Sequence, residues 1–419
     1  MSANTIRRTL LALCLLLWSA QIFAWEFDRR TPQFRDEFSY AIFPAPYNIP
    51  GIGKGVAIGA GLINIGGSYV DTYGLAITGD VEGNAIGISD IHLISKRLIL
   101  DIGASRISKA GFGINNSRGM EGDEDPDEFN TAHLTDSVFY GGQLILTFAE
   151  RRLEFAYQRY TTQARIESIV DSDGKLIAEI DDPMSDEEII ANGSVTLDLT
   201  DDRNDPRNGF RVKWSRNFPQ NVKEENVEFY TVDVNATAFI PVLTNSTWLF
   251  NYFQSDAVVL RQGETDRNKV GNDFTCATGD SVCDSEKDKA KDQIIAQNTY
   301  GSASTLGGNS RLRSFINTRF HGAHTRFYGT EFRWNLTDEK ERFNIFFMED
   351  LRTAIQIAFF YEYGSVADKE EDLFKETRHS TGIGIRAVMG SGLVYRLDYS
   401  VGEEGAETIL FFGYPWDIL

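Results

Sequence analysis

Three charged residues in the C-terminal third of the chain have the types and positions of a buried ion-pair cluster. Glu362 and Asp398 each lie in a segment where apolar and polar residues alternate, and both fall on the polar side. Arg313 lies between such segments, in "LGGNSRLRSFINTRF" (306–320). A guanidinium bridges carboxylates through paired hydrogen bonds, and an unpaired buried charge is costly. Arg313 therefore suits a bridge between them, although an exposed loop arginine also fits this stretch.

Catalytic chemistry has weaker support. The chain has five histidines, and a Ser/His/acid arrangement at one rim stays open because such sites are spatial rather than sequential. No nucleophile motif accompanies them, so we expect polar rim residues, no enzyme, no cofactor and no metal site. The histidines are His92, His133, His321, His324 and His379.

The elements that must position these charges alternate with a period of two. In "RFYGTEFRWNL" (326–336), Tyr328, Phe332 and Trp334 share one side, while Glu331 and Arg333 share the other. Successive strand side chains point to opposite faces, so each segment has an apolar face and a polar face. The pattern predicts strands.

The length of these runs indicates a membrane. They approach ten residues and are rimmed by Tyr, Phe and Trp, whereas strands of soluble sandwiches have about 5–6 residues. Tilted strands of roughly ten residues cross about 25 Å of hydrocarbon, with aromatic side chains at the lipid boundaries. A bilayer tolerates no unpaired strand edge, so the sheet must close. We predict an all-β, transmembrane antiparallel β-barrel.

The periodicity predicts 16 strands, an even number typical of such barrels. The N-terminal half is uncertain by one or two strands. The predicted strands are 54–65, 69–80, 84–95, 98–107, 136–148, 151–165, one within 166–181, four between 193 and 261, and 323–336, 352–366, 379–390, 392–402 and 407–416.

The composition of the first residues is typical of an export signal. Arg7 and Arg8 precede an apolar run of 12 residues, "TLLALCLLLWSA", which is shorter than the ~20 residues of a spanning helix. We predict a signal peptide at 1–24, a short periplasmic segment at 25–50, and a barrel domain at 51–419. Lipidation at Cys14 is a minor alternative because bulky Leu13 precedes it.

The net charge and the two cysteines in the third quarter of the chain limit which kinds of partner and site we expect. The formal net charge of −20 argues against a nucleic-acid partner. Cys276 and Cys283 lie in "FTCATGDSVCDSE", and an oxidising compartment favours a local disulfide between them. A zinc site is the weaker alternative because no histidine or further cysteine lies nearby.

Loop length predicts orientation. The long acidic segments 121–130, 181–188 and 262–305 are expected outside the cell, and the short turn at 390–392 in the periplasm. Acidic runs can bridge divalent cations to lipopolysaccharide, but a solvated loop is the simpler interpretation.

Several motifs, in order, resemble one family of barrels. "LGGNSRLRSF" is similar to the Leu-Gly-Gly…Val-Arg-Gly-Phe stretch of the BamA/TamA-like barrels, also called the bacterial surface antigen family. Leu312, Arg313, Ser314 and Phe315 take the motif positions, with Ser314 in place of the family glycine.

Four further stretches extend this resemblance over about 195–416. They are the turn "TDDRNDPRNGFRV" with Pro206 and Gly209, the strand "FYEYGSV" with Glu362 where aspartate is common, "GIGIRAVMGSGLVYRLDYSVG", and the closing strand "FFGYPW" with Gly413 and Trp416. Asp417, Ile418 and Leu419 follow Trp416, unlike an aromatic terminus.

The resemblance implies that a long extracellular loop folds into the lumen and brings Arg313 to Glu362 and Asp398. It also implies a weak seam between the first and last strands, which Gly413 and Pro415 would favour. No periplasmic POTRA module of the kind found in relatives fits before residue 51, nor does a lipase domain.

The function that follows is outer-membrane biogenesis, or protein or lipid translocation, in a Gram-negative outer membrane. A gated pore for small solutes is the alternative, and an outer-membrane hydrolase is the least favoured. Expected partners are outer-membrane lipid and lipopolysaccharide and a separate periplasmic protein, with a monomeric barrel and no nucleic acid.

Overall fold

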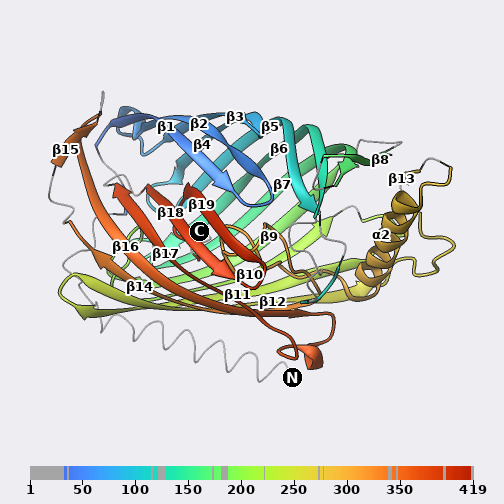
Figure 1. Cartoon of the computed structure of the whole chain (residues 1–419). Coiled ribbons are helices and arrows are strands. Elements are labelled where there is room, and N and C mark those ends of the chain that lie inside the picture. The colour runs from blue at the N-terminus through green and yellow to red at the C-terminus, as the bar shows by residue number, and fades with distance from the viewer. Residues whose placement is uncertain are drawn as a thin grey trace, which may run out of the picture.

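The strands close into one barrel, as a computed structural model of the chain shows (Figure 1). The structure describes residues 33–34, 37–114, 117–120, 129–171, 174–180, 187–220, 222–271, 274–276, 278–337, 342–345, 348–389 and 393–416. Sixteen antiparallel strands form the wall, and three short strands, β8, β13 and β15, lie outside it. The predicted fold class is confirmed.

The elements follow one another up and down around the wall. In chain order they are β1 (Ser39–Ile49), β2 (Gly53–Ile63), η2 (Ile65–Gly67), β3 (Asp71–Gly79), β4 (Glu82–Ile94), β5 (Leu98–Ile114), β6 (Asn130–Phe148), β7 (Leu153–Val170), β8 (Leu176–Ile180), β9 (Glu188–Thr200), β10 (Gly209–Gln220), β11 (Glu228–Leu243), β12 (Ser246–Arg261), β13 (Phe274–Thr275), α2 (Ser281–Tyr300), β14 (His324–Asn335), β15 (Arg342–Ile345), β16 (Met348–Ala367), η3 (Glu370–Asp372), β17 (Arg378–Met389), β18 (Val394–Gly402) and β19 (Gly405–Phe412).

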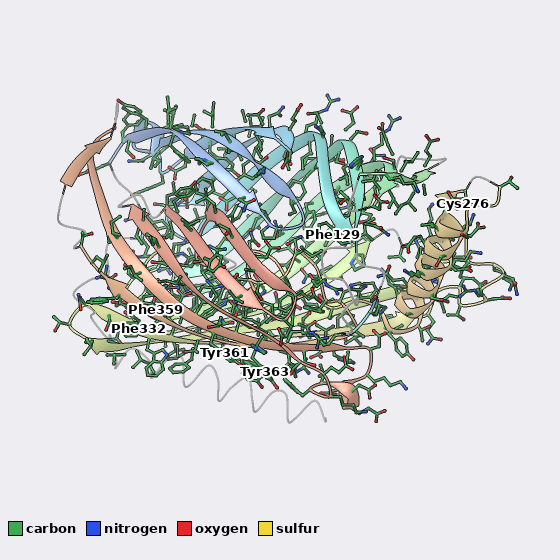
Figure 2. All side chains as sticks on the ribbon, viewed as in Figure 1. Phe129, Cys276, Phe332, Phe359, Tyr361 and Tyr363 are labelled. Carbon is green, nitrogen blue, oxygen red and sulfur yellow. A yellow bond between two sulfur atoms is a disulfide. The ribbon has the colours of Figure 1, made fainter. Side chains whose placement is uncertain are left out.

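The alternation places apolar side chains on the outer face. Phe359 and Tyr361 of β16 are about half exposed, whereas their neighbours Phe360 and Glu362 are buried. Figure 2 shows Phe332, Phe359, Tyr361 and Tyr363 along the outside of β14 and β16. In lipid these exposed rings contact acyl chains, while the polar partners of each strand turn to the lumen. Within the described ranges, none of the helices has the length and apolarity needed to cross a membrane.

The predicted domain boundary at residue 51 is wrong, because the barrel begins with β1. Residues 39–49 pair along their whole length with β2, from Ser39 opposite Ile63 to Ile49 opposite Gly53. The sequence of this segment is unlike that of a central strand, because it contains prolines at 44 and 46. β1 instead lies at the seam, where it closes the barrel against β19.

The strand predicted within 166–181 is not a wall strand. β8 pairs with the end of β7 and with β13, whereas β7 pairs along the wall with β9. The total of 16 therefore holds through two opposite errors, one strand missed at 39–49 and one added at 166–181.

The long segment 262–305, predicted as an extracellular loop, is not purely a loop, because it contains the helix α2. Asp280 caps this helix by accepting hydrogen bonds from the backbone N–H groups of Val282 and Cys283, and Gly301 ends it. In Figure 1 α2 lies at one end of the barrel, opposite to β15. The predicted signal peptide, residues 121–128 and 181–186, and the turn at 390–392 lie outside the described residues.

Candidate functional site: the lumen lock and the seam

The segment 306–320 lies inside the barrel, as expected, and forms a closed loop. Leu306 and Phe320 pair through backbone hydrogen bonds of 2.9 Å in both directions. Gly307 has φ +105°, and a Cβ there would lie 2.4 Å from the carbonyl oxygen of Ile316. This glycine is required because the conformation and the close approach both exclude a side chain.

Arg313 at the tip of this loop contacts three carboxylates. Its Nε donates to Glu362 Oε1 at 2.8 Å, its Nη1 to Asp398 Oδ2 at 2.8 Å and its Nη2 to Glu331 Oε2 at 3.2 Å. The backbone N–H of Arg313 also donates to Glu362 Oε2 at 2.8 Å. Arg313 and the three carboxylates are fully buried, so we call these four residues the lumen lock. The predicted pairing with Glu362 and Asp398 is present.

Glu331 is the lock residue that the sequence analysis did not assign. It lies on the polar face of β14, and alternation alone predicted its inward direction. Arg333 Nε donates to Glu331 at 2.7 Å and Arg386 Nη2 donates at 2.8 Å, while Arg396 binds Asp398. Two guanidiniums beyond Arg313 therefore share Glu331, which explains how a third buried carboxylate is tolerated.

Charge is nearly balanced within this cluster. Four buried guanidiniums face three buried carboxylates, which leaves one positive charge in excess. Burial opposes the charge of Arg313, but Glu362, Asp398 and Glu331 outweigh it and raise the pKa of Arg313 above its ordinary value. The guanidinium also stacks on Phe360, 3.4 Å from the ring centre. Arg313 is therefore a permanent cation of the lumen.

Ser314 occupies the family glycine position without strain. Its Oγ lies 2.6 Å from Ser380 Oγ, and its backbone N–H donates to the same hydroxyl at 3.1 Å. A Cβ on Gly402 would lie 2.1 Å from Ser314 Oγ, so the missing side chain at 402 provides the space. The left-handed residue of the tip is Leu312, with φ +53°. Leu312 and Phe315 are buried in the apolar cluster of the lumen.

The predicted closing strand 407–416 is wrong at its end. β19 stops at Phe412, and Gly413 takes φ +79°, which turns 413–416 into the lumen. Tyr414 Oη donates to Asp205 Oδ1 at 2.6 Å, and Trp416 Nε1 donates to Glu362 Oε1 at 2.9 Å. We call residues 413–416 the tail. Buried hydrogen bonds of the two aromatic side chains compensate for the lost strand pairing.

The turn that carries Pro206 and Gly209 helps to hold the tail. Gly209 has φ +107°, and a Cβ there would lie 2.1 Å from Leu199 O, so glycine is required. Asp205, next to Pro206, is buried and accepts from both Tyr414 and Gln356 Nε2. The turn motif therefore reaches the lumen as well as joining β9 to β10.

The seam between β1 and β19 has a single register pair, Asn48 with Leu410. β18 and β19 share eight register pairs, and β1 and β2 share eleven. Two side chains supplement the seam: Asn48 Nδ2 donates to Thr408 O, and Tyr395 Oη donates to Pro46 O. Figure 1 shows β1 in blue and β19 in red on either side of it.

Comparison with known proteins decides the family. The profile of the Omp85 superfamily domain matches residues 123–407, more than half of the chain. The chain belongs to the Omp85 superfamily. It is accordingly a Gram-negative outer-membrane protein. No curated protein matches the sequence.

Two solved structures are similar to this chain. BamA from Haemophilus ducreyi lacking POTRA domains 1–3 has a TM-score of 0.49 and 11% identity, covering 90% of this chain and 70% of that one. CdiB from Escherichia coli has a TM-score of 0.50 and 12% identity, covering 91% of this chain and 68% of that one. At such identities the likeness concerns the fold.

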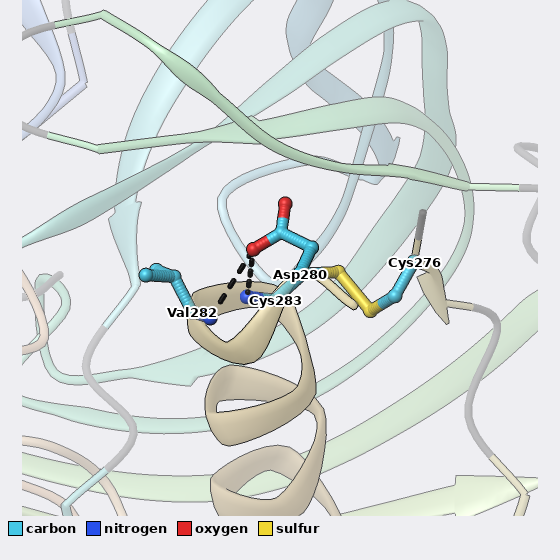
Figure 3. Close-up of a disulfide and its surroundings, with 4 residues drawn as sticks. All are labelled: Cys276, Asp280, Val282 and Cys283. Atoms are coloured by element: carbon cyan, nitrogen blue, oxygen red, sulfur yellow. Dashed lines mark hydrogen bonds between the residues drawn. A yellow bond between two sulfur atoms is a disulfide. The ribbon is translucent and has the colours of Figure 1, made fainter. Parts of the chain in front are cut away.

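The remaining predicted site residues of this Omp85 barrel lie at the end of the barrel that carries α2. Cys276 and Cys283 form the expected disulfide at the start of α2, next to the Asp280 cap (Figure 3). Among the described residues, no group of three or more His, Cys, Asp or Glu side chains is placed to hold a metal ion. The cluster that combines buried charges with a weakly paired strand edge is the lock, the tail and the seam.

Proposed function

We propose that this Omp85 barrel inserts polypeptides into the outer membrane, or passes them across it, through the β1–β19 seam. The single register pair between Asn48 and Leu410 carries this proposal. A ladder hydrogen bond contributes about 0.5–1.5 kcal/mol net, so this seam opens at a cost of a few kcal/mol. Opening the eight-pair β18–β19 interface would cost several times more.

The loop 306–320 and the tail occupy part of the lumen, which favours this route over a solute pore. Arg313, Phe315 and Trp416 are each at most 2% exposed within the barrel. Small solutes would need the loop and the tail to leave the lumen, which breaks the buried ion pairs of the lock. A lateral path through the seam leaves the lock intact. The alternative, a gated pore, predicts steady conductance in planar bilayers, and the proposal predicts a silent barrel.

A folding assay with a locked seam tests the proposal. The probe is an unfolded eight-stranded outer-membrane barrel, diluted from urea into liposomes that contain this protein. The variant Asn48→Cys/Leu410→Cys joins the register pair of the seam, because opposed strand residues have a Cα separation that suits a disulfide. The control, Ala238→Cys/Phe250→Cys, joins a register pair of β11 and β12.

We expect the protein without the seam disulfide to accelerate folding of the probe. The oxidised seam variant should not accelerate it, and reducing its disulfide should restore the acceleration. The oxidised control should keep full activity. Equal acceleration by the oxidised and reduced seam variants would contradict the proposal. Lipid, lipopolysaccharide, a periplasmic partner and a monomeric state stay predictions. The proposal includes no catalysis, so cleavage of lipid or peptide by the purified barrel would also contradict it.

A further inference from the structure

Two prolines lie within β1, and the pairing of β1 with β2 determines to which side their backbone groups point. Pro44 pairs with Ile58 and Pro46 with Val56, inside a ladder of eleven pairs without a register shift. In an antiparallel ladder every second residue exchanges hydrogen bonds with its partner, and the residues between turn their backbone groups to the other side. Proline has no N–H to donate, so an unbroken ladder requires Pro44 and Pro46 at the positions that face away from β2.

The side of β1 that faces away from β2 is the side at the seam. Two contacts at this edge are consistent with that direction. Pro46 O accepts a hydrogen bond from Tyr395 Oη, which reaches it from β18. Asn48, two positions further along, pairs with Leu410 of β19. Positions 44, 46 and 48 therefore share the edge of β1 that faces β19. Of these three, Asn48 is the residue that keeps a backbone donor.

The register shows what the prolines prevent. With Asn48 opposite Leu410, Pro46 stands opposite Phe412, and a further extension would bring Pro44 opposite Tyr414. Each of these two pairs lacks the N–H that β1 would have to donate. Beyond Phe412 the chain leaves the wall at Gly413, and the side chains of Tyr414 and Trp416 bind inside the lumen.

The other part of the same edge keeps its donors. Tyr40 and Ile42 also lie on the seam side of β1, and both have a backbone N–H. Because the tail turns inward, residues 39–43 have no partner strand on that side among the described residues. Their side chains at 40 and 42 are exposed on the outer face, at 62% and 45%.

We propose that Pro44 and Pro46 hold the seam at one register pair and thereby divide the edge of β1 into two parts. At positions 44 and 46 the edge of β1 has no backbone N–H with which to donate a hydrogen bond to β19 or to another strand. The part at 39–43 is left for an extended strand of a client polypeptide, and this second statement rests on the proposed function. Donor-free positions within an edge strand limit pairing, whereas open positions accept an added strand.

A disulfide test measures the first statement without any client. In an extended seam, position 43 would stand opposite position 415, so Phe43→Cys/Pro415→Cys reports extension. This pair is placed in three backgrounds: otherwise unchanged, with Pro44→Thr/Pro46→Thr, and with the matched control Pro241→Thr in β11. We expect little cross-link in the unchanged and control proteins. Restoring the two donors should raise the yield about tenfold, equivalent to about 1.4 kcal/mol.

An unchanged yield after Pro44→Thr/Pro46→Thr overturns the proposal, as does a high yield with the prolines in place. If the double variant fails to fold, Pro46→Thr alone is measured, with amide exchange at Phe412 as the readout. Exchange should slow when residue 46 can donate. Equal exchange in both proteins also overturns the proposal.

The second statement uses the folding probe described above and a photo-cross-linking residue at Tyr40 or at Ala45, because replacing either proline would restore a backbone N–H. We expect the folding probe to be captured at 40 and not at 45. Capture at 45 alone overturns the division of the edge. If the probe is captured at neither position and its folding is not accelerated, the proposed function fails, while the cross-link between positions 43 and 415 still decides the role of the prolines.

Discussion

Arginine 313 can be tested against a second arginine of the same loop. Arg311 is also buried, and its guanidinium stacks on Phe253 at 3.6 Å, yet its Nε and Nη2 have no hydrogen-bond partner among the described residues. Burial lowers the pKa of Arg311 to about 10. Replacing each arginine by methionine keeps most of the packing volume and removes the charge. The pair Arg313→Met and Arg311→Met therefore separates ion pairing from burial.

The expected cost differs because the partners differ. In Arg313→Met, Glu362 loses the side-chain hydrogen bond from Arg313 Nε and keeps those from the backbone N–H of residue 313 and from Trp416 Nε1. Glu331 and Asp398 keep other guanidiniums. Breaking a buried pair costs about 3–5 kcal/mol, mainly through the carboxylate left unpaired. Arg311→Met should cost less than about 1 kcal/mol, since it removes a poorly paired buried cation.

Labelling of a buried thiol measures this difference as loop opening. Ser314→Cys places a thiol beside the lock, where Ser314 is 2% exposed. If a bulky, water-soluble maleimide reacts only with the open loop, a cost of 3–5 kcal/mol raises the labelling rate about a hundredfold to several thousandfold. Arg311→Met should change it less than about tenfold. Adding Glu362→Gln to Arg313→Met should recover part of the loss. Equal labelling of the two methionine variants would refute the reasoning.

Other parts of the structure give separate predictions. Burial lowers the pKa of His321 to about 4, so the folded state favours the neutral form, which contacts Gln293. Because the unfolded state binds the proton near pH 6.5, the free energy of unfolding should fall by up to about 3 kcal/mol between pH 6.5 and 4. Faster amide exchange in α2 measures this fall, and His321→Gln should abolish the pH dependence. A Cβ on Gly384 would lie 1.9 Å from Asp398 Oδ1, so Gly384→Ala should displace this carboxylate. The variant should then raise the rate at which the thiol at position 314 is labelled, as Arg313→Met does. An unchanged labelling rate would contradict the geometry. Tyr414→Phe removes two buried hydrogen bonds of the tail and should cost about 1–3 kcal/mol, measured as faster carboxypeptidase digestion; an unchanged rate would show that the hydroxyl does not hold the tail.

Alternation predicted the direction of the lock carboxylates but not their grouping. Glu362, Asp398 and Glu331 each fall on the polar face of an alternating strand, so all three point inward by the same rule. The sequence pattern led us to pair Arg313 with Glu362 and Asp398 and not with Glu331. Which inward residues meet depends on strand register and on the depth to which the loop enters. Neither quantity is encoded in the period of a single strand.

The two errors at the seam have a common origin. Proline within a run disfavours a strand at 39–49, and the aromatic run at 411–416 favours a strand that continues. Both arguments are local. β1 accepts its prolines because they face an edge with a single register pair, and the chain turns inward at Gly413 because Asp205 and Glu362 provide partners for Tyr414 and Trp416.

The sequence by itself determined an exported, closed antiparallel barrel with charged residues facing the lumen. Export signals, period-two alternation and the cost of unpaired backbone in lipid are local or general constraints, so they can be evaluated without coordinates. Only the tertiary structure decided that Arg313 joins three carboxylates, that the tail enters the lumen and that the seam has one pair. These features depend on distances between residues 18 to 362 positions apart, which the closure of the barrel sets.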